Sequence, residues 1–432
     1  MDAVWIFVVV VLIGFAGWLV IRAWRARHGW IKWPGSVLSG IVTLLLLTVL
    51  VLGLLPIPPN VAPVPTPGLA GAQGPTPATF QPTDTQHNLI IHPGESIQAV
   101  IDQAIPGDTV VVMPGVYHEA LKVNVVNLTL LGEPDANGQW PILDGQGQMD
   151  TAVLATANFF TVEQFQIRNY TGNGVKTDNI YGAYYHNLFI TNPGQYGVFP
   201  VQNTHVVIQN VKVSGAKDAG IYVGQSRDVL VEFSEASHNN GGIEIESCVN
   251  SEVLNNDVHD NTLGILVWNS PEEDVFAKEG RNTKVINNRV ENNNSATIAT
   301  EEFLQSIPPG IGILVFMTGP TEVARNTISG NDSAGVGVAQ ASIIFNDTSK
   351  FTVPLIPEQT WLHDNQYANN GNHPAGFIVQ AHFPGADILW DVSSWDNRFD
   401  DRGVKTFPPL VPTSAWPDLF KRSLFQVYQF LK

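Results

Sequence analysis

The chain of 432 residues is poor in cysteine, methionine and basic residues. Cys248 is its only cysteine, so neither an intrachain disulfide nor a cysteine-based zinc site can form. The four methionines and the scattered histidines argue against a dedicated copper site. The chain has only 22 basic residues but 39 acidic ones, and this charge balance excludes nucleic acid as a partner. It also disfavours polyanionic glycans, unless Ca²⁺ bridges the charges.

The common cofactor and nucleophile motifs are missing as well. The sequence contains no P-loop, no Rossmann fingerprint and no nucleophile elbow. We therefore expect no cofactor and no dedicated metal site, with Ca²⁺ as the one ion left open.

Two long apolar runs, residues 3–21 and 37–55, stand at the N-terminus. Each is long enough for about 28 Å of helix, close to the thickness of the hydrocarbon layer. Basic residues and tryptophans between the runs favour a cytoplasmic loop. We predict a transmembrane helical hairpin over residues 1–57, with the rest of the chain on the extracytoplasmic side of the cell membrane. The alternative is a signal peptide that is cleaved after Ala72.

A proline-rich segment follows the second run. Nine prolines lie between residues 56 and 85 and favour an extended, semi-rigid spacer. Residues 58–86 are therefore predicted to be a linker that holds the next domain away from the bilayer.

A glycine followed by Ile or Val recurs through the middle of the chain. The spacing is 22 or 23 residues, apart from one interval of 48. A fixed period of this size is typical of a solenoid. We interpret the long interval as about two periods with an insertion, formed by residues 269–280 and 296–309. The repeated pairs are Gly174-Val175, Gly197-Val198, Gly220-Ile221, Gly242-Ile243, Gly264-Ile265, Gly312-Ile313 and Gly335-Val336.

Each repeat has the alternation of a strand and ends in asparagine-rich turns. In the stretch 242–246, Ile243 and Ile245 should point inward while Glu244 and Glu246 point outward. Asparagine tolerates the left-handed turn conformation, and stacked Asn side chains can hydrogen-bond along the solenoid axis. The many asparagines are therefore predicted to be structural.

The start of the solenoid carries the most specific pattern. Residues 88–91 read as a strand, 94–104 as a short amphipathic helix that caps the open end, and 109–113 and 116–117 as strands. The run Ile105-Pro106-Gly107-Asp108-Thr109 and its continuation to Tyr117 resemble the opening of right-handed parallel β-helix proteins of the pectin-lyase-like class. Residues 215–226, 242–247 and 261–271 further resemble a subset of exported bacterial β-helix proteins with no established activity.

The resemblance implies an all-β solenoid, a right-handed parallel β-helix over residues 87–400. It would be preceded by the transmembrane hairpin and the Pro-rich linker. Residues 401–432 would form a C-terminal loop and a capping helix, the helix over residues 417–432.

Stacking the repeat glycines places outward residues in columns about 4.8 Å apart. One column reads Phe199, Tyr222, Glu244, Leu266 and Leu314, and its neighbour reads Val201, Gly224, Glu246, Trp268 and Phe316. Aromatic rings beside carboxylates suit a sugar, which stacks on the rings and hydrogen-bonds the acids. The predicted ligand-binding residues are Phe199, Tyr222, Trp268, Asp218, Gln225 and Phe316.

The two glutamates are the candidate catalytic residues. Glu244 and Glu246 lie at i and i+2 of one strand, roughly 6.5–7 Å apart at the backbone. This overlaps the carboxyl spacing of inverting glycosidases, about 6.5–9.5 Å. A solvated pair, or a pair covered by the insertion, would give the same spacing.

A second acidic motif, Asp257-Val258-His259-Asp260, is similar to the Asp-Pro-His-Asp motif of alginate epimerases but lacks the proline. Neighbouring repeats hold related residues in the same register, at 234–239 and 290–293. We interpret the motif as an ordinary turn of the repeat.

Two functions remain open at this point. The first is a membrane-anchored extracytoplasmic protein that binds or modifies carbohydrate or cell-envelope polysaccharide. The second is a non-catalytic scaffold that docks a partner protein at the membrane surface. The sequence does not decide whether the protein is an enzyme.

Overall fold

The computed structural model describes residues 87–271, 280–394, 396–409 and 411–413. The predicted membrane hairpin, the linker and the C-terminal helix over 417–432 lie outside these residues. Within the described part of the chain, no helix is long and apolar enough to cross a membrane.

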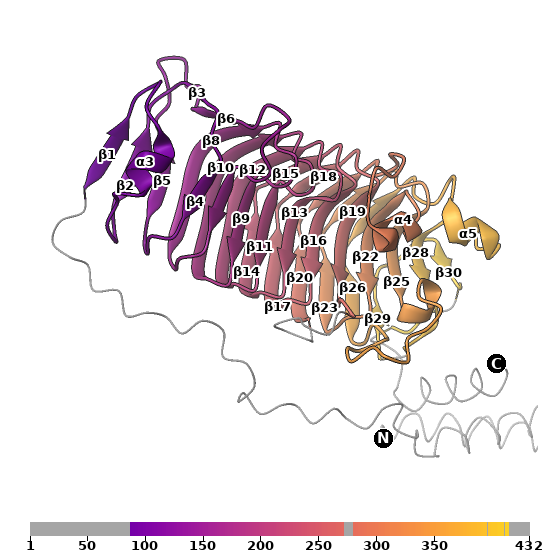
Figure 1. Ribbon diagram of the computed structural model, residues 1–432. Helices are drawn as coiled ribbons and strands as arrows, with labels where there is room; N and C mark the ends of the chain where they lie inside the picture. The colour runs from indigo at the N-terminus through magenta and orange to yellow at the C-terminus, as the bar shows by residue number, and fades with distance from the viewer. Residues whose placement is uncertain (1–86, 272–279, 395, 410, 414–432) are drawn as a thin grey trace, which may run out of the picture. The chain divides into compact units, whose positions relative to one another are not determined.

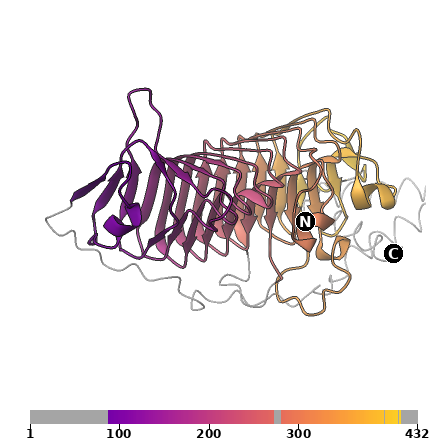
Figure 2. The ribbon, with the colours of Figure 1, turned by 45° about the horizontal axis from the view of Figure 1, so that its top comes forward.

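The described strands wind into a stack of coils with three faces (Figure 1). Strands of neighbouring coils pair in parallel, as between β13 (Ala219–Gly224) and β16 (Gly241–Glu246). The first and second faces form one continuous sheet because three long strands cross the corner between them, and the third face is a separate sheet. Figure 2 shows the strands of successive coils side by side along the stack. The predicted all-β parallel solenoid is confirmed.

The strands group by face as follows. The strands that cross from the first to the second face are β8 (Phe160–Arg168), β10 (Tyr181–Thr191) and β12 (Thr204–Ser214). The first face also holds β1 (Asn88–Ile91), β2 (Thr109–Val112), β5 (Thr129–Gly132), β14 (Arg227–Glu232), β17 (Val249–Leu254), β20 (Arg281–Ile286), β23 (Thr321–Ala324), β26 (Thr360–His363) and β29 (Arg398–Phe399). The second face also holds β3 (Val116–Tyr117), β6 (Ile142–Asp144), β15 (Glu235–Ser237), β18 (Asp257–His259), β21 (Arg289–Glu291), β24 (Thr327–Ser329) and β27 (Gln366–Ala368). The third face holds β4 (Leu121–Val123), β7 (Val153–Ala155), β9 (Val175–Asp178), β11 (Val198–Val201), β13, β16, β19 (Leu263–Trp268), β22 (Ile311–Phe316), β25 (Ala334–Ala339), β28 (Ala386–Trp390) and β30 (Thr406–Phe407).

The core is a continuous column of aliphatic side chains inside the coils. The Ile or Val after each repeat glycine is fully buried, as predicted, and each contributes about 1.5–3 kcal/mol of burial free energy. On β16, Ile243 and Ile245 point into this core, which leaves Glu244 and Glu246 on the outer side.

The repeat glycines are required by the stacking of the coils. A Cβ atom at Gly242 would lie 2.6 Å from the carbonyl oxygen of Gly264, the equivalent glycine of the next coil. Gly197 and Gly312 meet the glycine carbonyls of their own next coils at the same distance, 2.6 Å. The period seen in the sequence therefore marks the positions where one coil approaches the next too closely for a side chain.

The asparagines form two ladders along the stack, as predicted. In each ladder the side-chain oxygen of one Asn accepts hydrogen bonds from the backbone N–H and the amide group of an Asn in the neighbouring coil. The turn residue just before each ladder position is often left-handed, as at Asn255 (φ 56°). The first ladder comprises Asn239, Asn261, Asn293, Asn331 and Asn370, and ends on Asp387. The second comprises Asn256, Asn288, Asn326 and Asn365, and ends on Asp401.

The N-terminal end of the stack is capped by α3 (Ile97–Ile101), which is shorter than the predicted 94–104 helix. Ser96 caps it, and the Glu119 carboxylate accepts hydrogen bonds from the Ile97 and Gln98 N–H groups at 2.8 and 3.0 Å. At the other end β30 pairs with β28, so the stack extends past residue 400, its predicted end.

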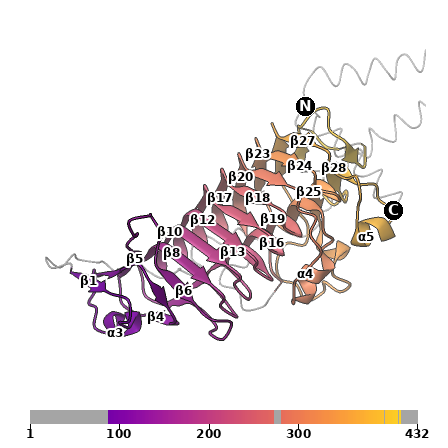
Figure 3. The same cartoon turned by 90° about the horizontal axis from the view of Figure 1, so that it is seen from above.

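The 48-residue interval is one coil and not two, so our interpretation of it was wrong. Leu263 pairs with Ile311, and Ile265 pairs with Ile313, so β19 and β22 are direct neighbours. Two insertions enlarge this coil: one between β19 and β20, largely outside the described residues, and one at 296–309 that contains α4 (Glu302–Ser306). Figure 3 shows α4 beside the third face. The short helices η1 (Ala341–Ile343) and α5 (Gly376–Gln380) lie in the long connections of the following coil.

Candidate functional site

Most of the predicted site residues lie on the outer side of the third face, in the predicted columns, and Asp218 and Gln225 flank β13 of the same face. Tyr222 pairs with Glu244, and Glu244 with Leu266, in successive coils. Glu246 pairs with Trp268 in the neighbouring column. The repeat glycines therefore located these side chains correctly relative to one another.

The exposure of this surface differs from the prediction. We expected an open aromatic and acidic face, but Glu244 and Glu246 are only 4% and 8% exposed, and Tyr222 and Trp268 are also buried. Phe199 alone among the predicted aromatics is half-buried. The surface is thus a largely enclosed site rather than an open platform.

Part of the enclosure comes from what we call the cover, residues 296–309 and 340–357. Phe303 of α4 stacks on Trp268 with ring centroids 4.1 Å apart, and the ring of Phe345 lies 6.1 Å from that of Phe316. Leu304 of α4 joins the same apolar cluster. Phe316 is fully buried in this cluster, so its predicted role in ligand binding is wrong: the cover occupies the surface that a ligand would need.

Glu244 lies in an otherwise apolar stretch of its column, followed by Leu266 and Leu314. Trp268 donates a hydrogen bond from Nε1 to Glu244 Oε1 at 2.7 Å. Burial raises the pKa of Glu244 well above its ordinary value, and the nearby Asp218 and Glu246 carboxyl groups raise it further. The raised pKa favours a protonated Glu244 that can donate a hydrogen bond or a proton.

Glu246 is held differently, by hydrogen bonds from two polar side chains. The Tyr222 hydroxyl donates to Glu246 Oε2 at 2.8 Å, and the Gln225 amide donates to Oε1. Gly224 makes room for the phenol, because a Cβ atom there would collide with the Tyr222 hydroxyl. Gln225, predicted to bind ligand directly, instead holds the candidate catalytic carboxyl group.

Asp218 completes a group of three buried carboxyl groups. It precedes β13, is 4% exposed, and its Oδ1 atom has no hydrogen-bond partner within the described part of the chain. Burial raises the pKa of Asp218 from 3.8 to about 7, the Tyr196 hydroxyl acts in the opposite direction, and Glu301 of the cover adds to the increase. Asp218 and Glu244 therefore have pKa values well above those of ordinary surface carboxylates.

An aromatic group borders the three acids. The ring of Tyr196 stacks on that of Phe199 with centroids 4.4 Å apart, and Tyr222 lies 4.9 Å from Tyr196 and 5.0 Å from Phe199. The Lys176 ammonium lies 5.0 Å from the centre of the Phe199 ring. We call the acids together with these three rings the third-face site: Asp218, Glu244, Glu246, Tyr196, Phe199 and Tyr222.

Two members of this surface were missed by the sequence analysis. Tyr196 immediately precedes the repeat glycine Gly197, a position that the outward columns did not include. Glu301 lies in the insertion, which has no period that could place it. Only the aromatic nature of Tyr196, beside a repeat glycine, could have indicated its role.

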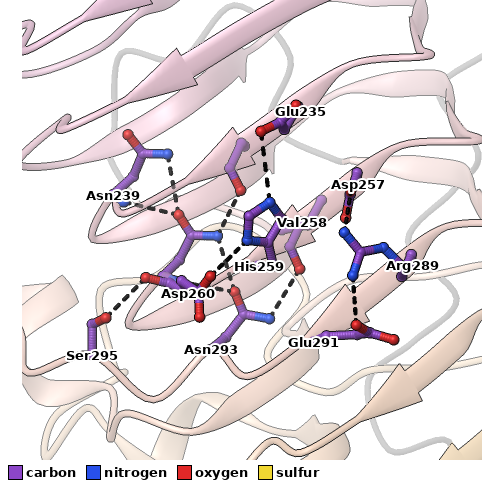
Figure 4. A network of polar contacts seen from close by, with 12 residues as sticks. Glu235, Asn239, Asp257, Val258, His259, Asp260, Arg289, Glu291, Asn293 and Ser295 are labelled. Atoms are coloured by element: carbon purple, nitrogen blue, oxygen red, sulfur yellow. Dashed lines mark hydrogen bonds and ion pairs between the residues drawn. The ribbon is translucent and has the colours of Figure 1, made fainter.

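The motif at 257–260 belongs to the regular second face, as expected for an ordinary part of the repeat, but it is a strand and not a turn: Asp257, Val258 and His259 form β18, and Asp260 follows it. Figure 4 shows His259 between Glu235 and Asp260, with nitrogen–oxygen distances of 3.7 and 2.7 Å. Arg289 of the next coil forms ion pairs with Asp257 and with its own neighbour Glu291. These side chains form ion-pair rows along the coils. Among the described residues, no group of three or more His, Cys, Asp or Glu side chains is arranged to hold a metal ion.

The comparisons with known proteins agree with this architecture. The sequence matches the family model described as right handed beta helix region over residues 148–276 and 196–380, together more than half of the chain. The chain therefore belongs to this family, and it is a right-handed parallel β-helix protein of the pectin-lyase-like class. No curated protein matches it significantly.

Several solved β-helix structures resemble the chain distantly. The lacto-N-biosidase of Eubacterium ramulus is 12% identical, with 74% of this chain and 67% of that chain covered and a TM-score of 0.46. The DFA-IIIase of Arthrobacter chlorophenolicus, in complex with DFA-III, is 12% identical, with 72% and 90% covered and a TM-score of 0.44. The mannuronan C-5 epimerase A-module of Azotobacter vinelandii is 15% identical, with 63% and 90% covered and a TM-score of 0.34. Likenesses at this level describe the fold alone.

Proposed function

We propose that this protein binds carbohydrate at the third-face site, with the β-helix on the extracytoplasmic side of the cell membrane. The observation that carries the proposal is the burial of Glu244 and Glu246 beside an aromatic group. A stack needs only apolar residues at these positions, as Leu266 and Leu314 illustrate in the same column. Buried carboxyl groups cost stability, so a functional reason for them is favoured.

A sugar suits the chemistry of this site. Its apolar ring face can pack on the half-buried Phe199, and its hydroxyl groups can hydrogen-bond the carboxyl groups behind that ring. The Lys176 ammonium next to Phe199 supplies a donor for a further hydroxyl group. With acids in the majority, the site favours an uncharged glycan over a polyanion.

A more specific proposal is that the protein also modifies the sugar that it binds. Glu244 is the candidate general acid because its raised pKa favours the protonated form. Glu246, which accepts hydrogen bonds from Tyr222 and Gln225, is the candidate base. Environments that separate the roles of two carboxyl groups in this way are typical of acid–base pairs.

Membrane attachment rests on the sequence. The two apolar runs at 3–21 and 37–55, with basic residues between them, support a hairpin anchor with a cytoplasmic loop. The Pro-rich linker would then hold the β-helix away from the bilayer. Reporter fusions after residues 30 and 57 test this topology: a reporter that is active only outside the cytoplasm should respond at residue 57 and not at residue 30.

The binding proposal is tested with the full-length protein in detergent on an array of uncharged and acidic glycans. Phe199→Ala and Glu244→Gln should each lower binding to the recognised glycans about tenfold, since one lost stacking contact or buried hydrogen bond is worth about 1–2 kcal/mol. Phe189→Ala is the matched control, because Phe189 is an exposed ring on β10, 42% accessible and outside the third face.

The outcomes separate the two candidate functions. Binding that survives both site variants would rule out the third-face site. A folded protein that binds and converts no glycan would favour the alternative, a non-catalytic scaffold that docks a partner protein. A loss of product formation in Glu244→Gln that is far larger than its loss of binding would establish that the protein modifies the bound sugar.

A further inference from the structure

The first face carries an aromatic surface that the third-face site does not use. It consists of five rings from three neighbouring coils. Phe159 precedes β8, Tyr181, Tyr184 and His186 come from β10, and His205 comes from β12. We call these five residues the first-face platform.

The rings of the first-face platform are close enough to form one continuous surface. Tyr181 lies 5.4 Å from Phe159 and 6.2 Å from His205, and its ring is nearly parallel to that of His205. Tyr184 lies 5.8 Å from His205 and 6.4 Å from His186. The platform thus extends across the coil spacing and along the strand.

The outward direction of Tyr184 and His186 follows from strand alternation. Tyr185, between Tyr184 and His186, is fully buried, and its hydroxyl bonds to Thr177 at 2.5 Å inside the coil. The residues on either side of it must therefore point outward. The neighbouring coils have Thr161 and Val207 in register with Tyr184, so the stack does not require an aromatic ring at this position.

The platform is accessible and keeps its polar atoms available. His205 is exposed, and the other four rings are only partly buried. Within the described part of the chain, no hydrogen bond is formed by the Tyr181 and Tyr184 hydroxyls or by the ring nitrogens of His186 and His205. Flat rings with free hydroxyl and imidazole groups at their edges can stack on a ligand and hydrogen-bond it at the same time.

The surroundings favour a glycan over an apolar protein segment. Glu163 and Gln209 are in register with His186 on the two neighbouring strands, so polar groups border the rings on both sides. The Glu163 carboxylate also accepts a hydrogen bond from Asn187 at 3.1 Å and disfavours a polyanion. Sugar rings offer both an apolar face and hydroxyl groups, which matches this alternation of rings and polar groups.

We propose that the first-face platform is a second binding surface for an uncharged polysaccharide, separate from the third-face site. His205 and Phe199 belong to one coil, on β12 and β11, with the corner at Gln202 and Asn203 between them. The platform therefore lies around one corner of the coil from the third-face site. It holds the glycan chain by stacking and involves no acid–base chemistry.

The test is isothermal titration of the full-length protein in detergent with cello-oligosaccharides and xylo-oligosaccharides, and affinity electrophoresis in gels that contain the corresponding polymers. Tyr181→Ala combined with Tyr184→Ala should weaken binding at least tenfold. Tyr181→Phe combined with Tyr184→Phe, which keeps the stacking rings, should lose less. Phe189→Ala is the matched control, because it removes an exposed ring from the same strand, on its second-face half.

Unchanged binding in the alanine double variant, or no binding of any uncharged glycan by the wild type, would overturn the proposal. A protein partner that is lost only with the Tyr181 and Tyr184 variants, without glycan binding, would overturn it in favour of protein docking. Titration of Glu244→Gln distinguishes the two surfaces: it should impair the third-face site and leave the contribution of the platform intact. The thermal unfolding midpoint of each variant is measured as well, so that a loss of binding is attributed to the surface only in variants that remain folded.

Discussion

Replacing Asp218 with Asn should change how the stability of the protein depends on pH. Burial raises the pKa of Asp218 to about 7 in the folded protein. In the unfolded chain its pKa is about 3.9. The folded state therefore holds the proton more tightly, and the stability that this contributes is complete below about pH 4 and is lost as the pH rises through about 7. Asn cannot ionise, so Asp218→Asn should escape this loss.

The size of the effect follows from the two pKa values. Between pH 4.5 and pH 8, wild-type Asp218 should lose about 3 kcal/mol of folding stability that the Asn variant keeps. For a chain of this size, 1 kcal/mol corresponds to about 2 °C in the unfolding midpoint. The midpoint of the variant minus that of the wild type should therefore increase by about 6 °C from pH 4.5 to pH 8.

The assay is thermal unfolding followed by tryptophan fluorescence at several pH values. Glu244 also has a raised pKa and contributes to the wild-type profile, so the variant and the wild type are compared at each pH. Asp228→Asn is the control, since Asp228 is an exposed carboxylate on β14, and its profile should follow the wild type. Parallel profiles for Asp218→Asn and the wild type would show that Asp218 is ionised in the folded protein and would refute the reasoning.

Three further predictions concern the stack and the site. Gly242→Ala should strongly destabilise the protein, because the new Cβ would lie 2.6 Å from the Gly264 carbonyl oxygen. Gly241→Ala should be tolerated, because its Cβ would have its nearest contact at 3.5 Å, and equal unfolding midpoints of the two variants would contradict this prediction. Asn293→Ala should lower the free energy of unfolding in denaturant by about 2–4 kcal/mol, because it leaves hydrogen-bonding groups of the ladder unpaired. Asn346→Ala, at an exposed position, should lower it hardly at all, and a small loss at both positions would argue against the ladder. Removal of Ca²⁺ with EGTA should leave glycan binding unchanged, because Glu246 and Glu244 accept hydrogen bonds from protein groups; a loss that Ca²⁺ restores would revise the site.

Much of the stack could be predicted because its interactions repeat at a fixed spacing. The Gly-Ile or Gly-Val pair identifies both the close contact between coils and the next inward side chain, so the register of Tyr222 with Glu244 followed from the sequence. The asparagine ladders followed for the same reason. The 48-residue interval was misread because its length alone cannot distinguish an extra coil from an enlarged one, and only the pairing of Ile265 with Ile313 decides it.

The enclosure of the site could not be predicted in the same way. The stack of Phe303 on Trp268 depends on how an aperiodic insertion folds back over the third face, and no repeat determines that path. The sequence analysis therefore assumed that a side chain on the outer side of a strand is exposed to solvent. This is true of Phe189 on the second face, but Phe316 lies beneath the cover and is buried. The same assumption is the reason why the sequence analysis missed the burial of Asp218 and hence its raised pKa.

The central claim is that a carbohydrate binds at the third-face site. Hydrogen–deuterium exchange of the full-length protein, with and without a glycan identified on the array, tests this claim most directly. The account predicts slower exchange on glycan addition in residues 196–201 and 218–246, which include β11, β13 and β16, and loss of this protection in Glu244→Gln. Protection confined to other parts of the chain would contradict it.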